Sequence, residues 1–124
     1  MIATGAASQP RHERPSGPPY HSVMPDSERG FDAICPNLHW RDAPGAAPDD
    51  AAAASRANGG VPDSRLIGDV AGAASVLRSV PTSNGRVGDI GYCSGGRQCV
   101  LAACHLDLDA SVECYGGAGS RPRC

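Results

Sequence analysis

The stretch RVGDIGYCSGGRQCVLAAC occupies residues 86–104, and it decides how the chain is expected to fold. Residues 86–92, with Val87, Ile90 and Tyr92 after the turn signal at 83–85, predict a strand. Residues 94–104 predict a helix, with Val100, Leu101 and Ala103 giving it apolar faces. A strand that turns into a helix without a connecting loop is therefore expected at Cys93.

The turn itself has the sequence Gly91-Tyr92-Cys93-Ser94-Gly95, which matches a nucleophile elbow with Cys in the position usually held by Ser. Side chains two positions either side of the strained tip would collide, so Gly91 and Gly95 are expected to relieve the crowding, and Gly96 to let the helix approach the sheet. The helix N-terminus favours the thiolate of Cys93 and directs the backbone N–H of Ser94 toward a developing oxyanion. A glycine-rich link without chemistry is the alternative, but the flanking strand and helix favour the nucleophile.

The rest of the chain supplies further elements around this turn. Their order of strand, helix, strand, helix, strand predicts an α/β fold with parallel strands and right-handed crossovers. We expect disorder at 1–30 and 118–124, strands at 31–35 and 109–115, a turn at 83–85, and helices at 51–57 and 63–79, the second capped by Asp63.

Composition narrows the possible functions. The net charge is −2, and no basic face suggests a nucleic-acid partner. No apolar run approaches the length of a membrane helix, and the N-terminal residues lack the charged start and apolar centre of a secretory signal. We therefore expect a cytoplasmic protein with no membrane partner. The six cysteines are then expected to be reduced thiols rather than a disulfide framework.

Several separated segments resemble the dienelactone hydrolase family, which is an α/β-hydrolase family. They are Gly30–Leu38, Trp40-Arg41, Ser83–Gly88, Ile90–Arg97, Leu106–Ala110 and Cys114–Gly116. The resemblance covers about residues 31–117 and implies part of a three-layer αβα hydrolase domain. It implies hydrolysis of a small ester or lactone through a Cys-His-Asp triad, with Cys93 as nucleophile and no cofactor.

Other parts of that pattern are missing. On this fold the triad acid and His follow the nucleophile, yet only 31 residues come after Cys93. His105 is expected to lie at the far end of the helix, about 16 Å along its axis from the thiol. The family's strand before Phe31, with its His-Glu pair, has no counterpart, so an unfilled gap is expected between the strands that contain Phe31 and Tyr92. We therefore expect a truncated or frame-shifted fragment that is inactive alone.

Two other hypotheses about the function remain open. A Cys/His metal module built from Cys99, Cys104, His105 and Cys114 is one, although the spacing matches no common zinc pattern and the expected metal set is none. A remnant without function is the other. Trp40 and Arg41 either line an acyl or carboxylate site or form an ordinary loop surface. Asp89 places a carboxylate within the central strand, where burial without a partner is costly.

Overall fold

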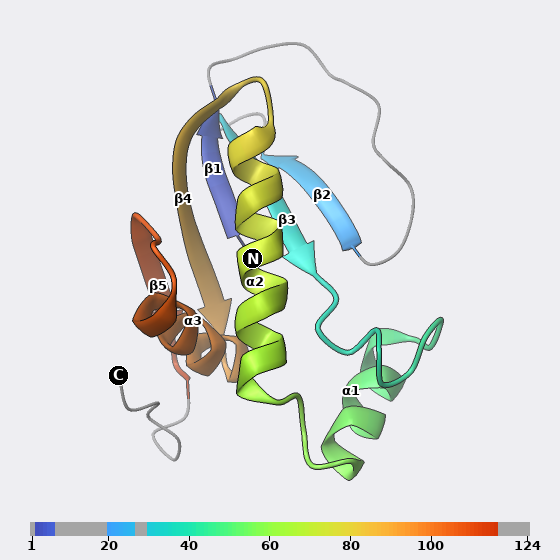
Figure 1. Ribbon diagram of the computed structural model, residues 1–124. Helices are drawn as coiled ribbons and strands as arrows, with labels where there is room; N and C mark the ends of the chain where they lie inside the picture. The colour runs from blue at the N-terminus through green and yellow to red at the C-terminus, as the bar shows by residue number, and fades with distance from the viewer. Residues whose placement is uncertain (1, 7–19, 27–29, 117–124) are drawn as a thin grey trace.

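The computed structural model describes residues 2–6, 20–26 and 30–116, and the side chains of 30–116 except that of Pro48. The described elements follow one another along the chain as β1 Ile2–Ala6, β2 Tyr20–Asp26, β3 Phe31–Pro36, α1 Pro48–Ala57, α2 Asp63–Ser79, β4 Ser83–Tyr92, α3 Ser94–His105 and β5 Ala110–Cys114 (Figure 1). None of the helices in this described part is long and apolar enough to cross a membrane.

The strands form one sheet in the order β2-β3-β1-β4-β5. β4 and β5 pair in parallel, whereas β1 is antiparallel to both of its neighbours, β3 and β4. The strands β3, β4 and β5 therefore run in the same direction, as the sequence predicts. β2 pairs antiparallel with β3 at the other edge of the sheet.

The expected gap between β3 and β4 is absent, because β1 occupies it (Figure 1). Ile2 is paired with Ile34 on one side and with Asp89 on the other. Backbone groups that a missing parallel strand would leave without partners are thus bonded to an antiparallel one. Of the range 1–30, where disorder is expected, the structure places the segments 2–6 and 20–26 in strands of this sheet. The remaining positions of that range lie outside the described residues, as does the tail expected at 118–124.

The elements predicted between 31 and 115 are confirmed, with small changes at their ends. β4 begins at Ser83 rather than after a separate turn, because Ser83 pairs with Ala6 across an irregularity in the ladder. Asp63 does not cap α2, since Pro62 stands at the N-cap and Asp63 is the first helical residue. Its carboxylate instead accepts a hydrogen bond from the guanidinium of Arg97 on α3.

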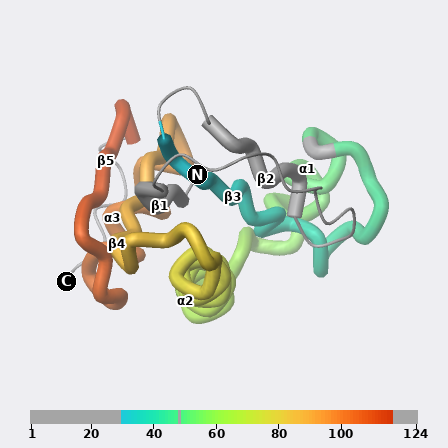
Figure 2. Tube along the Cα trace, turned by 90° about the horizontal axis from the view of Figure 1, so that it is seen from above, coloured from blue at the N-terminus to red at the C-terminus, as the bar shows by residue number. Residues whose placement is uncertain are grey.

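The core lies on one face of the sheet. Leu66, Val70 and Leu77 of α2 pack with residues of the strands and of α3, and the cluster is completed by Ile34, Ala73, Ala74, Val87, Leu101 and Ala102. Figure 2 shows α2 on one side of β4 and β3, and α2 also contacts α3. The described part thus has one helical layer against the sheet. The α/β class is confirmed, but the second helical layer of the expected three-layer arrangement is not formed by these residues.

Candidate active site

Cys93 lies where the sequence places it, between the end of β4 and the first residue of α3. Its backbone has φ 53° and ψ −121°, a combination that costs energy for a residue with a side chain. Two hydrogen bonds hold it there: its N–H donates to the Cys114 carbonyl at 3.0 Å, and its carbonyl accepts from the Gly96 N–H at 3.0 Å. The fold thus holds an exposed thiol at the tip of a sharp strand-to-helix turn.

Gly91 and Gly95 differ in what they contribute to this turn. A Cβ at Gly91 would lie 2.1 Å from the Gly95 carbonyl oxygen and 2.7 Å from the Cys99 sulfur, so no side chain fits. A Cβ at Gly95 would meet nothing within 4 Å. The expectation that both glycines relieve crowding is right for Gly91 and wrong for Gly95, whose backbone is what crowds Gly91.

Gly96 allows a close approach between α3 and the end of β5. A Cβ there would lie 3.0 Å from a carboxylate oxygen of Glu113 and 3.0 Å from the backbone nitrogen of Gly116. The Glu113 carboxylate accepts a hydrogen bond from that same N–H, which fixes the backbone against the helix. The approach of α3 to the sheet at Gly96 is therefore as predicted.

Ser94 is the first residue of α3. The N–H groups of the first helical turn have no carbonyl partner within their own helix, so the Ser94 N–H is a donor next to the thiol. The macrodipole adds partial positive charge at the same point. The Ser94 N–H and the helix macrodipole together would stabilise a negatively charged oxygen atom placed next to the Cys93 sulfur.

No histidine or carboxylate of the described residues is hydrogen-bonded to the Cys93 thiol. His105 is the last residue of α3, and its Nδ1 lies 3.0 Å from the Leu101 carbonyl oxygen. This contact ties the ring to its own helix at the end away from Cys93. Within the described part of the chain, the Cys93 thiol therefore has no histidine or carboxylate as a hydrogen-bond partner.

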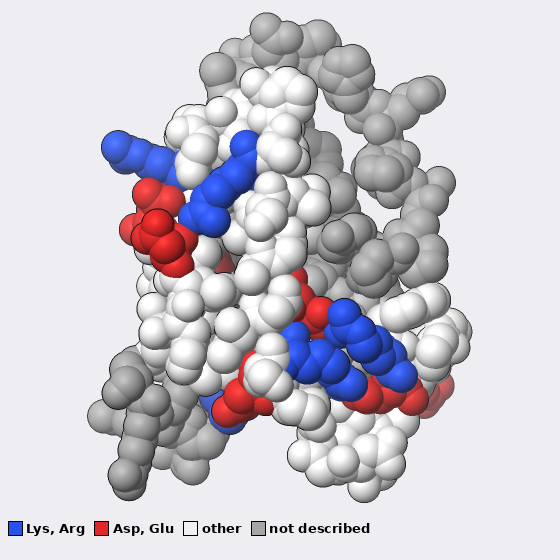
Figure 3. All heavy atoms as spheres, in the orientation of Figure 1, with Lys and Arg blue, Asp and Glu red and all other residues white. Residues whose placement is uncertain are grey.

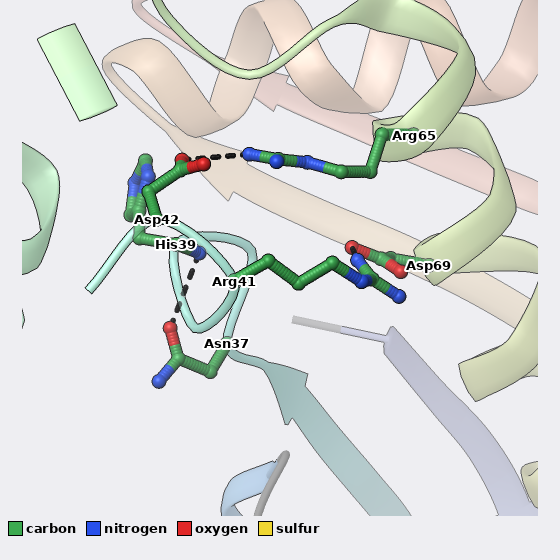
Figure 4. Close-up of polar contacts among 6 residues, drawn as sticks. All are labelled: Asn37, His39, Arg41, Asp42, Arg65 and Asp69. Carbon is green, nitrogen blue, oxygen red and sulfur yellow. Dashed lines mark hydrogen bonds and ion pairs between the residues drawn. The ribbon is translucent and has the colours of Figure 1, made fainter. Parts of the chain in front are cut away.

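The loop after β3 is bound to α2 by two ion pairs, which Figure 4 shows side by side. Arg41 contacts the Asp69 carboxylate at 2.7 Å, and Arg65 contacts the Asp42 carboxylate at 2.6 Å. The hydrogen bond from Arg65 lowers the pKa of Asp42 below its usual value. Because the Arg41 guanidinium is paired with Asp69, Arg41 agrees with the interpretation as an ordinary loop residue rather than with that of an acyl or carboxylate site.

Charged groups elsewhere on the described surface are also mixed in sign. A third ion pair joins Arg97 to Asp63 at 3.1 Å. On the face drawn in Figure 3, cationic and acidic side chains lie next to one another rather than in a patch of one sign. The described residues on this face form no extended basic surface of the kind that binds a phosphate backbone.

A cavity of about 410 Å³ lies beside the turn, between the ends of β3 and β4 and the start of α3. Both sequence neighbours of Cys93, Tyr92 and Ser94, line it, although Cys93 itself does not. The other lining residues are Cys35, Pro36, Asn37, Leu38, His39, Val70, Asp89, Ile90, Gly91, Gly95, Gln98 and Cys99. A small molecule held in this cavity would contact the residues that directly precede and follow Cys93 in the chain.

Asp89, which the sequence places within the central strand, also lines the cavity, and the sequence did not predict this second feature. It is only 7% exposed, yet it lines the cavity, and its Oδ1 has no hydrogen-bond partner. The adjacent Cys99 shows the effect of this environment: burial raises the pKa of its thiol to about 12, and the Asp89 charge adds to the increase. A carboxylate within a largely apolar strand was visible in the sequence, but the sequence pattern did not predict which residues would surround it.

The cysteines of the described part do not form a metal site. No group of three or more His, Cys, Asp or Glu side chains among these residues could hold a metal ion, which argues against the Cys/His module. Cys35, Cys93, Cys99 and Cys114 are free thiols, whereas Cys104 is disulfide-bonded. The expectation of reduced cysteines is therefore wrong for Cys104.

Comparison with known proteins agrees with this geometry. The sequence profile described as the dienelactone hydrolase family matches residues 27–123. The carboxymethylenebutenolidase of Pseudomonas putida is 35% identical over 94 residues, which cover 72% of this chain and 40% of that protein. Carboxymethylenebutenolidase 1 of Cupriavidus pinatubonensis is 34% identical over 101 residues, covering 70% and 39%. The matched part of the chain thus spans about 40% of the length of these curated relatives.

Proposed function

Because the chain belongs to the dienelactone hydrolase family, we propose that it reacts with a carboxylic ester or lactone of a small molecule through the thiol of Cys93. The observation that carries this proposal is the backbone of Cys93, which has a positive φ at the junction of β4 and α3. A side chain is kept in this strained conformation when its exposure has a use. We assign the hydrolase-like part to residues 31–117.

The reaction begins when the Cys93 sulfur attacks the carbonyl carbon. A C–S bond forms, and the carbonyl oxygen becomes an oxyanion that accepts a hydrogen bond from the Ser94 N–H. Collapse of this intermediate breaks the C–O bond, and the departing alkoxide takes up the proton that the thiol gave away. A water molecule then attacks the thioester, which releases the acid and returns a proton to the sulfur.

Both proton transfers call for a base near the sulfur, and the described residues supply none. A missing general base lowers rates by about 10²–10⁴. We therefore propose that this chain alone forms the thioester slowly and hydrolyses it hardly at all. Turnover would require an acid and a histidine that lie outside the described residues.

The test uses 4-nitrophenyl acetate with the full chain and with two variants. We expect slow nitrophenolate release that stops near one equivalent, with the acetyl group on Cys93 by mass spectrometry. Cys93→Ala should lose this reaction, and Cys114→Ala, which removes a free thiol that does not line the cavity, should keep it. Sustained turnover that requires Cys93 would contradict the inactive-fragment proposal. Acetylation unaffected by Cys93→Ala would contradict the nucleophile.

We propose the cytoplasm as the place of this reaction. The free thiols of Cys35, Cys93, Cys99 and Cys114 support a reducing compartment, and the disulfide at Cys104 argues against one. Cell fractionation of the expressed chain tests this proposal: recovery in the cytoplasmic fraction is expected, and recovery in an oxidising compartment would contradict it.

A further inference from the structure

Two exposed tyrosine rings are paired beside the turn that holds Cys93. Tyr92 is 54% exposed and Tyr115 is 75% exposed, and their ring centroids lie 6.0 Å apart with the ring planes tilted by 51°. A single exposed aromatic side chain is ordinary on a protein surface, whereas two neighbouring rings leave a joint apolar area open to solvent. We call Tyr92 and Tyr115 the tyrosine pair.

The tyrosine pair is connected to the Cys93 turn through the backbone. Tyr92 directly precedes Cys93 and lines the cavity. Tyr115 directly follows Cys114, whose carbonyl accepts the hydrogen bond from the Cys93 N–H at 3.0 Å. The two rings therefore belong to the chain neighbours of two hydrogen-bonded residues, and one of the rings forms part of the edge of the cavity.

The backbone of Tyr115 is strained. Its φ is 46°, a left-handed conformation that glycine and asparagine adopt with less strain than tyrosine. The hydrogen bond from the Gly116 N–H to the Glu113 carboxylate spans this residue and holds the conformation. Among the residues that the structure describes, Cys93 is the only other one with a side chain at positive φ. A large side chain kept in such a conformation next to the thiol points to a use for its ring.

Resting on the role of Cys93 proposed above, we propose that the tyrosine pair binds an aromatic ring in the acyl part of the substrate. An ester of an aryl or arylalkyl carboxylic acid fits the observations, because aromatic rings attract one another beyond the effect of the apolar area that they bury. The acyl part stays bonded to the Cys93 sulfur in the thioester, so its ring can remain on the pair until water releases the acid. Tyr92 and Tyr115 are then residues that determine specificity, and they take no part in bond breaking.

The experiment measures how fast Cys93 reacts with two methanethiosulfonates of similar size, one bearing a benzyl group and the other a cyclohexylmethyl group. The Cys93 sulfur attacks the sulfenyl sulfur, a mixed disulfide forms, methanesulfinate leaves, and the thiol proton goes to water. Peptide-resolved mass spectrometry separates Cys93 from the other free thiols. The benzyl-to-cyclohexylmethyl rate ratio is divided by the same ratio for 2-mercaptoethanol, which removes the intrinsic difference between the reagents.

We expect a corrected ratio of about threefold or more for the unmodified chain. Tyr115→Asn should bring the ratio close to one, because it removes a ring and introduces a residue that tolerates positive φ. Phe31→Leu is the matched control and should leave the ratio unchanged. Phe31 is another exposed aromatic residue, but it lies level with the start of β4, whereas the Cys93 turn follows the end of that strand.

The outcomes separate the two proposals. If Cys93 reacts with neither reagent, the proposed nucleophile fails and the preference for an aromatic acyl group fails with it. If Cys93 reacts but its ratio is one or below, or is the same in Tyr115→Asn, the preference alone is overturned. If Tyr115→Asn does not fold, as judged by circular dichroism, Tyr92→Leu takes its place, and an unchanged ratio in that variant overturns the preference. If neither variant folds, the ratio of the unmodified chain decides.

Discussion

The two halves of the sheet are built in different ways. On one side, β4, α3 and β5 follow a parallel strand-helix-strand path and meet at backbone contacts too close for a side chain at Gly91. On the other side, β1, β2 and β3 are joined by antiparallel pairing along their length. The first half contains Cys93 and Ser94, whereas the second half contributes only residues 35–39 of the cavity lining.

This difference shows which kinds of structure are encoded locally. The tightest contacts at the turn, those of Gly91, involve residues no more than eight positions apart, from Gly91 to Cys99, although the Cys93 N–H also donates to the distant Cys114 carbonyl. The position of β1 depends on pairing with strands far along the chain, with Ile2 opposite Asp89. The steric demand at the turn leaves a pattern of glycines in the sequence, whereas residues 2–6 do not themselves indicate which distant strands they pair with.

The largest expected effect comes from Gly91→Ala, which tests the half with the tight contacts. The new Cβ would lie 2.1 Å from the Gly95 carbonyl oxygen, a backbone atom that cannot move without displacing α3. We expect a loss of at least about 3 kcal/mol in the free energy of unfolding, because overpacking against backbone cannot relax. Urea denaturation followed by far-UV circular dichroism measures it.

Gly95→Ala is the matched control for that substitution. Its Cβ would meet nothing within 4 Å, and the residue lies within the first turn of α3. Replacing a helical Gly by Ala stabilises by up to about 1 kcal/mol, so this variant should be at least as stable as the parent. Equal losses in the two variants would mean that the contact at Gly91 does not determine the turn.

The sequence predicted the strand-to-helix turn as far as the turn is local. Cys93, Gly91 and Gly96 lie where the elbow pattern placed them, and the helix at 63–79 has the expected ends. The function of Gly95 was misassigned, because the pattern is symmetric about Cys93 and the actual crowding is not.

The parts that the sequence missed depend on neighbours far along the chain. The segments 2–6 and 20–26 lack apolar periodicity, yet both pair with β3. The ion pair between Arg41 and Asp69 joins residues 28 positions apart, so the loop after β3 could not be distinguished from a ligand site. Such contacts follow from the tertiary arrangement, which a local pattern cannot specify.

Asp89→Leu gives the next largest effect, and it should increase stability. The parent buries a carboxylate with an unpartnered Oδ1 on the face that carries Val87 and the core. An unsatisfied buried polar group costs about 1–3 kcal/mol, and the adjoining cavity leaves room for a larger side chain. Urea denaturation should show a gain within that range.

The control for this gain is another carboxylate of the same half that does have a partner. Asp109 accepts a hydrogen bond from the Val87 N–H at 2.8 Å, so Asp109→Leu should lower stability. If Asp89→Leu also lowers stability, the interaction of the Asp89 carboxylate with Cys99 outweighs the cost of its unpartnered Oδ1.

The smallest expected effect concerns the other half, where the loop after β3 joins α2 at Asp42 and Arg65. The hydrogen bond from Arg65 holds the pKa of Asp42 below its ordinary value of 3.8 in the folded state. A depressed folded-state pKa contributes stability that is fully present above 3.8 and is lost as the pH falls through the lower folded value. Asp42→Asn should therefore lose stability at neutral pH and weaken the decline below 3.8. Urea denaturation across that range measures both, and an unchanged acid decline in the variant would show that the ion pair does not couple this loop to folding.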